Sequence, residues 1–156
     1  MRFLFPCIIV LCFLAICSCS VFFGDEFERI PIDNVCSREN CSVESALIDL
    51  EKDEEISLWS DYDVEYEGNL QLEYQIVVVI DEKDTLDMMA FDPFYTNVTI
   101  NSRSIQMNNH YEESAEAKLC DFTARKTGSY EFNVVVFANQ KPGEFIFTKG
   151  DLVFRK

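Results

Sequence analysis

Acidic side chains are the groups in this sequence most able to do chemistry, because 28 of its 156 residues are Asp or Glu. The run over residues 61–67 places a carboxylate at every second position, and a strand directs such residues to one face. One ion cannot collect them all, because neighbours on a strand face stand roughly 7 Å apart. Loops can fold around a hard cation such as Ca²⁺. We therefore take Asp81, Asp84 and Asp87 as candidate ligands, with a solvated acidic surface as the alternative.

Aromatic side chains offer a second kind of site, a platform on which sugar rings could stack. Trp59 and Tyr95 are the surface candidates for such stacking. Tyr62, Tyr66 and Tyr74 fall instead at core-facing positions of an alternating pattern, so we expect them to pack in the interior.

Catalytic signatures are absent from the sequence. His110 is the single histidine and stands among polar residues typical of a loop. A nucleophilic site built on histidine would have to use it. Phosphate-binding, dinucleotide-binding and zinc-protease motifs are missing as well. We therefore expect a protein that is not an enzyme and has no cofactor, Ca²⁺ being the one ion that its acidic loops suggest.

Three cysteines follow residue 19, and an odd number cannot all pair within one chain. Cys36 and Cys41 are close enough in sequence to form a disulfide in an oxidising compartment. Cys120 alternates with apolar residues in a strand-like run, which predicts a small buried core residue.

The first twenty residues have the pattern of an export signal. Arg2 precedes an apolar run that reaches about Cys17, and small residues follow. The run is too short for a stable transmembrane helix. Ile16-Cys17-Ser18-Cys19 resembles the lipobox of bacterial lipoproteins. The resemblance implies that residues 1–18 are a signal peptide and that Cys19 carries a lipid which holds the protein on a membrane.

Two alternatives to the lipoprotein stay open. Cleavage after Ser20 would give a soluble secreted protein, because Ser18 and Ser20 also suit a signal peptidase. The sequons beginning at Asn40 and Asn97 would suit a secreted eukaryotic glycoprotein. Cysteine in the middle of the first sequon makes a poor acceptor, and Asn97 is predicted to lie in a strand.

Charge limits the partners of the protein. The leader contains one charged residue, Arg2, so the remaining chain has 28 acidic and 12 basic residues and a net charge of −16. Residues 25–92 hold 21 acidic and 4 basic residues, whereas residues 93–156 hold 7 and 8. Nucleic-acid binding requires Lys and Arg, so we expect no nucleic-acid partner. The expected partners are the membrane, through the lipid, and a protein or glycan.

Alternating apolar and polar residues predict the elements that position these groups. Residues 61–67 and 70–80 alternate on either side of a Gly-Asn turn and are predicted to form a hairpin. The end of the chain predicts two short strands, over 144–148 and 151–155, or one strand with a bulge at Gly150. Further strand patterns recur every eight to twelve residues, beginning at 45–51.

These patterns predict an all-β domain, a single antiparallel β-sandwich of about eight short strands, over residues 41–156. Jelly-roll and immunoglobulin-like topologies fit equally well. Residues 19–40 lack periodicity and are predicted to be a tether or extended lead-in. The sequence therefore favours a non-enzymatic, exported, lipid-anchored protein of the cell envelope with a binding or structural role. A carbohydrate- or calcium-binding module is the alternative, as is the secreted glycoprotein.

Overall fold

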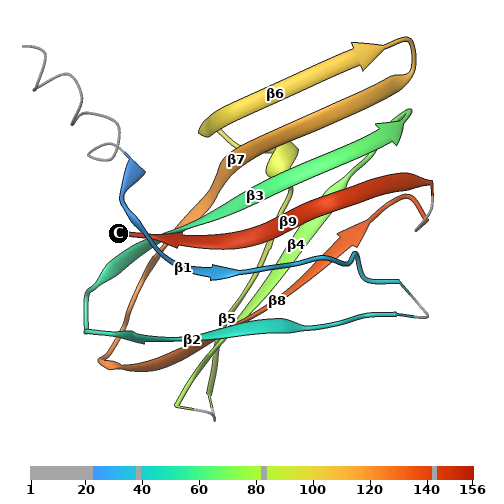
Figure 1. The fold of residues 1–156 in the computed structure, drawn as a ribbon. Coiled ribbons are helices and arrows are strands. Elements are labelled where there is room, and N and C mark those ends of the chain that lie inside the picture. The colour runs from blue at the N-terminus through green and yellow to red at the C-terminus, as the bar shows by residue number, and fades with distance from the viewer. Residues whose placement is uncertain (1–22, 38–39, 82–83, 142–143) are drawn as a thin grey trace, which may run out of the picture.

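The computed structural model describes residues 23–37, 40–81, 84–141 and 144–156. Two antiparallel sheets pack together as an all-β sandwich (Figure 1), which confirms the predicted fold class. The chain forms nine strands and one short 3₁₀ helix within these ranges: β1 Glu26–Ile30, β2 Glu44–Leu50, β3 Glu55–Glu67, β4 Leu72–Ile80, β5 Asp84–Phe91, η1 Pro93–Tyr95, β6 Thr99–Met107, β7 His110–Thr123, β8 Gly128–Ala138 and β9 Phe145–Arg155.

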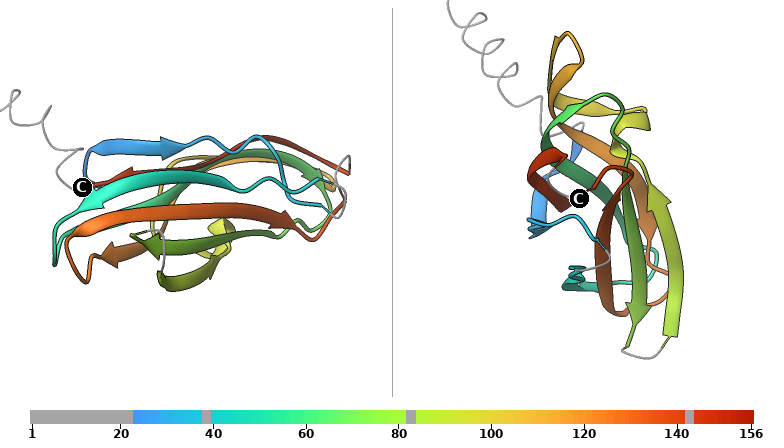
Figure 2. Two further views of the ribbon diagram at one scale, coloured as in Figure 1. Left: turned by 90° about the horizontal axis from the view of Figure 1, so that it is seen from below. Right: turned by 90° about the vertical axis from the view of Figure 1, so that its right-hand side faces the viewer.

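The strand order sets which residues can meet. The five-stranded sheet has the order β1-β9-β3-β7-β6, and the four-stranded sheet has the order β2-β8-β4-β5. Figure 2 shows the two layers edge-on. Strands from distant parts of the sequence are therefore neighbours, and β3 lies between β9 and β7 at the centre of its sheet.

The core lies between the sheets and follows the period of two that the sequence shows. From β3, Tyr62, Val64 and Tyr66 point inward and are buried. From β4, alternate residues including Tyr74 and Ile76 are fully buried. The carboxylates of residues 61–67 consequently lie on the outer face of the five-stranded sheet, as predicted.

The predicted hairpin of residues 61–67 and 70–80 is wrong. β3 pairs with β7 and β9, while β4 pairs with β5 and β8, so the two strands belong to opposite sheets. Gly68 has a φ of +80°, a conformation that glycine adopts readily, and its N–H donates to the carbonyl of Asn109 (2.9 Å). The alternation is compatible with both arrangements, because two apolar faces can meet across a core as well as share one sheet.

The predicted start of the domain at residue 41 is also wrong. β1 pairs with β9, and Ile30 and Ile32 are buried in the core. The backbone of Asp25 exchanges two hydrogen bonds with that of Lys156 (2.8 and 3.1 Å). β1 is an edge strand whose first residues are exposed, so its sequence lacks the apolar alternation that marks the other strands.

The end of the chain forms the single strand β9. Its bulge falls at residue 148, because Asp63 pairs with Lys149 and Val64 pairs with Phe147. Gly150 is required for a different reason. A Cβ at this position would lie 2.1 Å from the ring of Phe147, so a larger residue could not fit without moving that ring.

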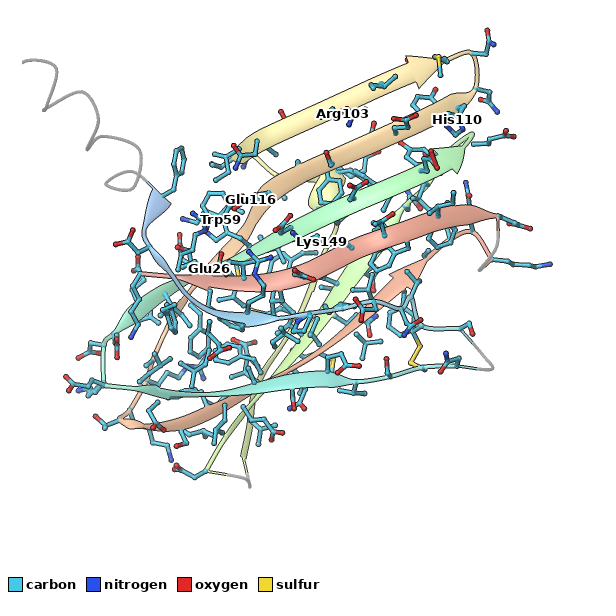
Figure 3. All side chains as sticks on the ribbon, in the orientation of Figure 1. Glu26, Trp59, Arg103, His110, Glu116 and Lys149 are labelled. Carbon is cyan, nitrogen blue, oxygen red and sulfur yellow. A yellow bond between two sulfur atoms is a disulfide. The ribbon has the colours of Figure 1, made fainter. Side chains whose placement is uncertain are left out.

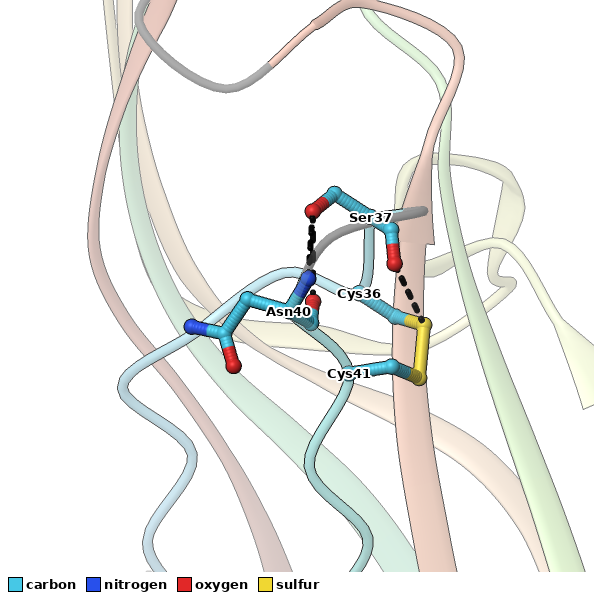
Figure 4. The surroundings of a disulfide bond; sticks show 4 residues. All are labelled: Cys36, Ser37, Asn40 and Cys41. Carbon is cyan, nitrogen blue, oxygen red and sulfur yellow. Dashed lines mark hydrogen bonds between the residues drawn. A yellow bond between two sulfur atoms is a disulfide. The ribbon is translucent and has the colours of Figure 1, made fainter.

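Cys36 and Cys41 form a disulfide with a Cα–Cα distance of 4.2 Å (Figure 4). The bond closes a short loop in the connection between β1 and β2. Within this loop, the Asn40 N–H donates a hydrogen bond to the Ser37 hydroxyl (3.1 Å). The Cys36 N–H donates to the Val136 carbonyl (2.6 Å), which fixes the loop to β8. Cys120, a free thiol on β7, is half-buried against the core.

The predicted signal peptide and the predicted acylation site, Cys19, lie outside the described residues. Over the ranges that the structure describes, no helix combines the length and the hydropathy needed to span a membrane.

Candidate functional site

The β6–β7 hairpin projects from one end of the sandwich (Figure 2, right), and a cleft lies on its inner side. The side chains of β6 are mostly exposed, because this strand is the edge of the five-stranded sheet. The opposite wall of the cleft is η1. The cleft has a volume of about 380 Å³, and its lining includes Tyr62, Tyr66, Phe94, Tyr95, Arg103, Ser104 and Glu113.

The short helix η1 is fixed by its own sequence. The Asp92 carboxylate accepts a hydrogen bond from the Phe94 N–H (2.9 Å), and Pro93 occupies the first turn, where a missing N–H costs nothing. Burial raises the pKa of Asp92. Pro93 is buried, whereas Tyr95 is 78 % exposed. The helix therefore holds one aromatic ring out at the rim of the cleft.

Packed aromatic rings form the floor of the cleft. Phe94 meets Tyr62 edge-on, with ring centroids 5.3 Å apart, and it lies 6.3 Å from Tyr66. Tyr66 in turn stacks on Tyr111 at 5.1 Å. Tyr62 and Tyr66 are only 6 % and 9 % exposed. Edge-on and stacked contacts of this kind stabilise the floor of the cleft. Because Tyr62 and Tyr66 are buried, Tyr95 is the ring most accessible to a ligand.

Glu113 places a carboxylate on the inner side of the hairpin. It lies opposite Val64 in the register of β3 and β7, and it accepts a hydrogen bond from the Ser104 hydroxyl (3.4 Å). Burial raises the pKa of Tyr62 and of Tyr66 to about 12, and the negative charge of Glu113 adds to both shifts. Even an ordinary tyrosine, with a pKa of about 10, is protonated at neutral pH, so these shifts leave both groups neutral.

Of the two predicted stacking residues, the structure brings only Tyr95 to the cleft. Trp59 points to the outer face of the five-stranded sheet, and only 1 % of it is exposed. Phe23 packs edge-on against its ring at 5.8 Å, and the Arg155 guanidinium lies over it at 5.2 Å. The prediction that Trp59 is a surface platform is wrong, because these two residues cover a ring that the strand alternation directs outward.

Two of the three candidate calcium ligands, Asp81 and Asp87, form ion pairs with basic side chains. Asp81 contacts the ammonium of Lys126 (2.9 Å), which lowers the pKa of the carboxyl. Asp87 lies 3.8 Å from the guanidinium of Arg125. Asp84 begins β5. Lysine and arginine thus balance the charge of Asp81 and Asp87, and this arrangement gives a calcium site no support.

Asn97, predicted to be a strand residue, lies exposed in the bend between η1 and β6. The strand begins two residues later, at Thr99. The second sequon therefore stands on an accessible loop, which is the position that a glycan needs.

Ion pairs cover the outer face of the five-stranded sheet at β1, β9 and β3, and Figure 3 labels two of their members, Glu26 and Lys149. The Arg29 guanidinium contacts Asp61 (2.8 Å), Asp151 (2.7 Å) and Glu26 (2.7 Å). Lys149 also contacts Asp61. Asp151 is 7 % exposed and accepts a further hydrogen bond from the Ile32 N–H (3.4 Å). This network fastens β1 to the sheet, so we assign it a structural role.

Sequence reasoning missed a cluster at the other end of this face. Glu65, His110 and Glu112 bring ligand atoms within 4.8 Å of one another, and together they could hold a metal ion. His110 begins β7 instead of lying in a loop. Its spacing from Glu112 is visible in the sequence, but the approach of Glu65 depends on the pairing of β3 with β7.

Comparisons with protein-family models, curated proteins and solved structures return no match to this chain.

Proposed function

We propose that this chain is an exported, lipid-anchored, non-enzymatic protein of the cell envelope, and that its β-sandwich binds a saccharide in the cleft between η1 and the β6–β7 hairpin. The observation that carries the proposal is the combination of an exposed aromatic ring, a rigid aromatic floor and several hydrogen-bonding groups in one hollow. A sugar ring has an apolar face and a polar edge, so it is matched by these two kinds of group side by side.

Each part of the cleft has a role in this proposal. Tyr95 stacks on the apolar face of the sugar. Ser104 and Glu113 supply a donor and an acceptor from the hairpin, and the Tyr62 and Tyr66 rings form the floor. A volume of about 380 Å³ is at the lower end of small-molecule sites, which suits a mono- or disaccharide unit of a longer glycan.

Binding without cleavage is favoured by the acidic groups of the cleft. Hydrolysis of a glycosidic bond normally uses two carboxyl groups, placed about 5 to 10 Å apart across the bond. Among the described residues that line the cleft, Glu113 is the one carboxylate. It can accept hydrogen bonds from sugar hydroxyls but has no second acid to act with it.

The lipid anchor rests on the sequence around Cys19. Because β1 begins at Glu26, residues 20–25 would be the whole spacer between an acylated Cys19 and the sandwich. Six residues span at most about 20 Å when fully extended. A protein anchored in this way would hold its sandwich close to the membrane surface.

The binding proposal is tested with Tyr95→Ala. The mature protein is first screened on a glycan array, and the affinity for the best ligand is then measured by calorimetry. An aromatic contact is worth about 0.5 to 1.5 kcal/mol beyond its buried area, so we expect Tyr95→Ala to weaken binding about tenfold. The matched control is Met88→Ala, which removes a similarly exposed side chain (73 %) from β5. No binding on the array, or equal loss in both variants, would contradict the proposal.

A further inference from the structure

We propose that Glu65, His110 and Glu112 form a binding site for a divalent transition-metal ion, with Zn²⁺ as the test metal. The site lies on the outer face of the five-stranded sheet, opposite the cleft, and it does not depend on saccharide binding. Figure 3 shows His110 near the tip of the β6–β7 hairpin and Arg103 midway along β6.

Strand pairing brings the three ligands together. Glu65 lies directly opposite Glu112 in the register of β3 and β7, and His110 lies opposite Glu67, one step further along the same face. Directly opposed residues have Cβ atoms about 4.5 to 5.5 Å apart. His110 and Glu112 are separated by two residues on β7 and so point the same way. The site is therefore supported by the two longest strands of the sheet instead of by a loop.

The distances are those of a site that small side-chain rotations can close. The His110 Nε2 and Glu65 Oε1 atoms are 3.9 Å apart, and all three ligand atoms lie within 4.8 Å. Ligands of one tetrahedral Zn²⁺ stand about 3.4 Å from each other, given bonds of 2.0 to 2.2 Å. Each side chain is between 34 % and 38 % exposed, so it has room to move by this amount, and water can fill the fourth position.

Charge supplies an independent reason for a cation here. Two carboxylates placed directly opposite each other on neighbouring strands repel and destabilise the pairing. A divalent ion between Glu65 and Glu112 would convert this repulsion into attraction. The Arg103 guanidinium lies 3.3 Å from the Glu112 carboxylate and relieves part of the repulsion in the metal-free protein. Because Arg103 is 66 % exposed, it can withdraw when the ion enters.

The ligand set decides the kind of metal. One imidazole nitrogen with two carboxylates suits Zn²⁺ and its first-row neighbours. Ca²⁺ takes six to eight oxygen ligands, which this group does not offer. We therefore expect Zn²⁺ to bind and Ca²⁺ to have no effect.

The experiment is a Zn²⁺ titration of the full mature protein by calorimetry, with thermal unfolding as a second readout. We expect one ion per chain and a rise in melting temperature. Losing a second-shell partner typically weakens metal binding about 10- to 100-fold, and His110→Ala removes a direct ligand, so it should weaken binding by about 100-fold or more. Glu67→Gln is the matched control, since it removes a neighbouring exposed carboxylate outside the cluster. It should leave binding unchanged.

Arg103→Ala provides a test in the opposite direction. It removes the cation that competes for Glu112, so Zn²⁺ should bind several-fold more tightly. Co²⁺ substitution should give visible bands without the near-ultraviolet thiolate band that Cys120 would produce. Absence of one-to-one Zn²⁺ binding, equal binding by His110→Ala and wild type, or a thiolate band would each overturn the proposal.

Discussion

Asp61 is the residue on which the outer ion-pair network converges, since Arg29 and Lys149 both contact it. Burial alone would raise the pKa of Asp61, but the hydrogen bonds from Arg29 and Lys149 outweigh burial, and the pKa is lowered. A lowered pKa in the folded state means that ionised Asp61 stabilises the fold. This stabilisation is complete above the unfolded-state pKa, about 3.9, and it is lost as the pH falls through the lower native value.

We predict that Asp61→Asn lowers the free energy of unfolding at pH 7 by about 1 to 3 kcal/mol, because it removes charged hydrogen bonds from two cations. The difference from wild type should begin to shrink below about pH 4, where the unfolded chain takes up a proton, and should disappear once the pH falls below the lowered native pKa. Urea unfolding at several pH values measures both effects. Asp63→Asn, an exposed acid on the same face, should change stability by less than about 0.5 kcal/mol. A pH-independent difference would show that the pairs with Asp61 are not responsible.

Residue-level prediction from the sequence succeeded where one strand decides the outcome. The alternation of residues 61–67 correctly separated inward from outward side chains. It also directed Trp59 outward, but Phe23 and Arg155 come from the two ends of the described chain to cover that ring. Glu65 and His110 meet for a similar reason, through pairing between strands. Contacts of this kind depend on register, which no local pattern contains.

At the scale of elements, the β1–β2 connection is held by the disulfide and by hydrogen bonds. The Cys36–Cys41 bond closes a short loop, and Cys36 also bonds to the backbone of β8. A cross-link stabilises a protein mainly by restricting the unfolded chain, and the gain grows only slowly with loop length.

Reduction of this disulfide should lower the free energy of unfolding by about 2 kcal/mol, as expected for so short a loop. Urea unfolding with and without reductant measures the change. Cys120→Ser should respond like wild type, because Cys120 is outside the bond. The double variant Cys36→Ser with Cys41→Ser should have the same free energy of unfolding as the reduced protein, and reductant should not change it. Equal stability of oxidised and reduced wild type would contradict this account.

The sequence predicted most strands but few of their partners. Period-two patterns located β2 and β4 to within two residues and the second half of β3, since each has one buried face. The same patterns could not assign β3 and β4 to opposite sheets. β1 was not predicted, because an edge strand needs little apolar surface. The only residues that indicate η1 in the sequence are the capping Asp92 and Pro93 in the first turn.

For the whole molecule, the division of charge along the sequence disappears in three dimensions. In both sheets, strands from the acidic half of the chain lie beside strands from the C-terminal half. Lys126 thus meets Asp81, and Lys156 meets Glu54 (2.6 Å). Basic residues of the C-terminal half thus pair with acids of the N-terminal half.

The proposed lipid anchor concerns the whole molecule, and we predict that Cys19→Ala releases the protein from the membrane fraction or leaves it unprocessed. The substitution would remove both the proposed site of lipid attachment and the cleavage site beside it. Fractionation and intact mass measure the outcome, and Cys17→Ala should behave like wild type. A variant that stays with the membrane would refute acylation at Cys19, and a mass that falls on glycosidase treatment would favour a glycoprotein modified at Asn97.

The pairing of β1 with β9 has a mechanical consequence. Asp25 is bonded to Lys156 at the end of the sandwich opposite the tip of the β6–β7 hairpin (Figure 1). Force between a lipid at Cys19 and a glycan held at the cleft would pull β1 along its own length, past its antiparallel neighbour. The hydrogen bonds between β1 and β9 would then be loaded in shear and would have to break together, instead of breaking one after another. The short edge strand β1 would therefore give a tethered domain its resistance to tension.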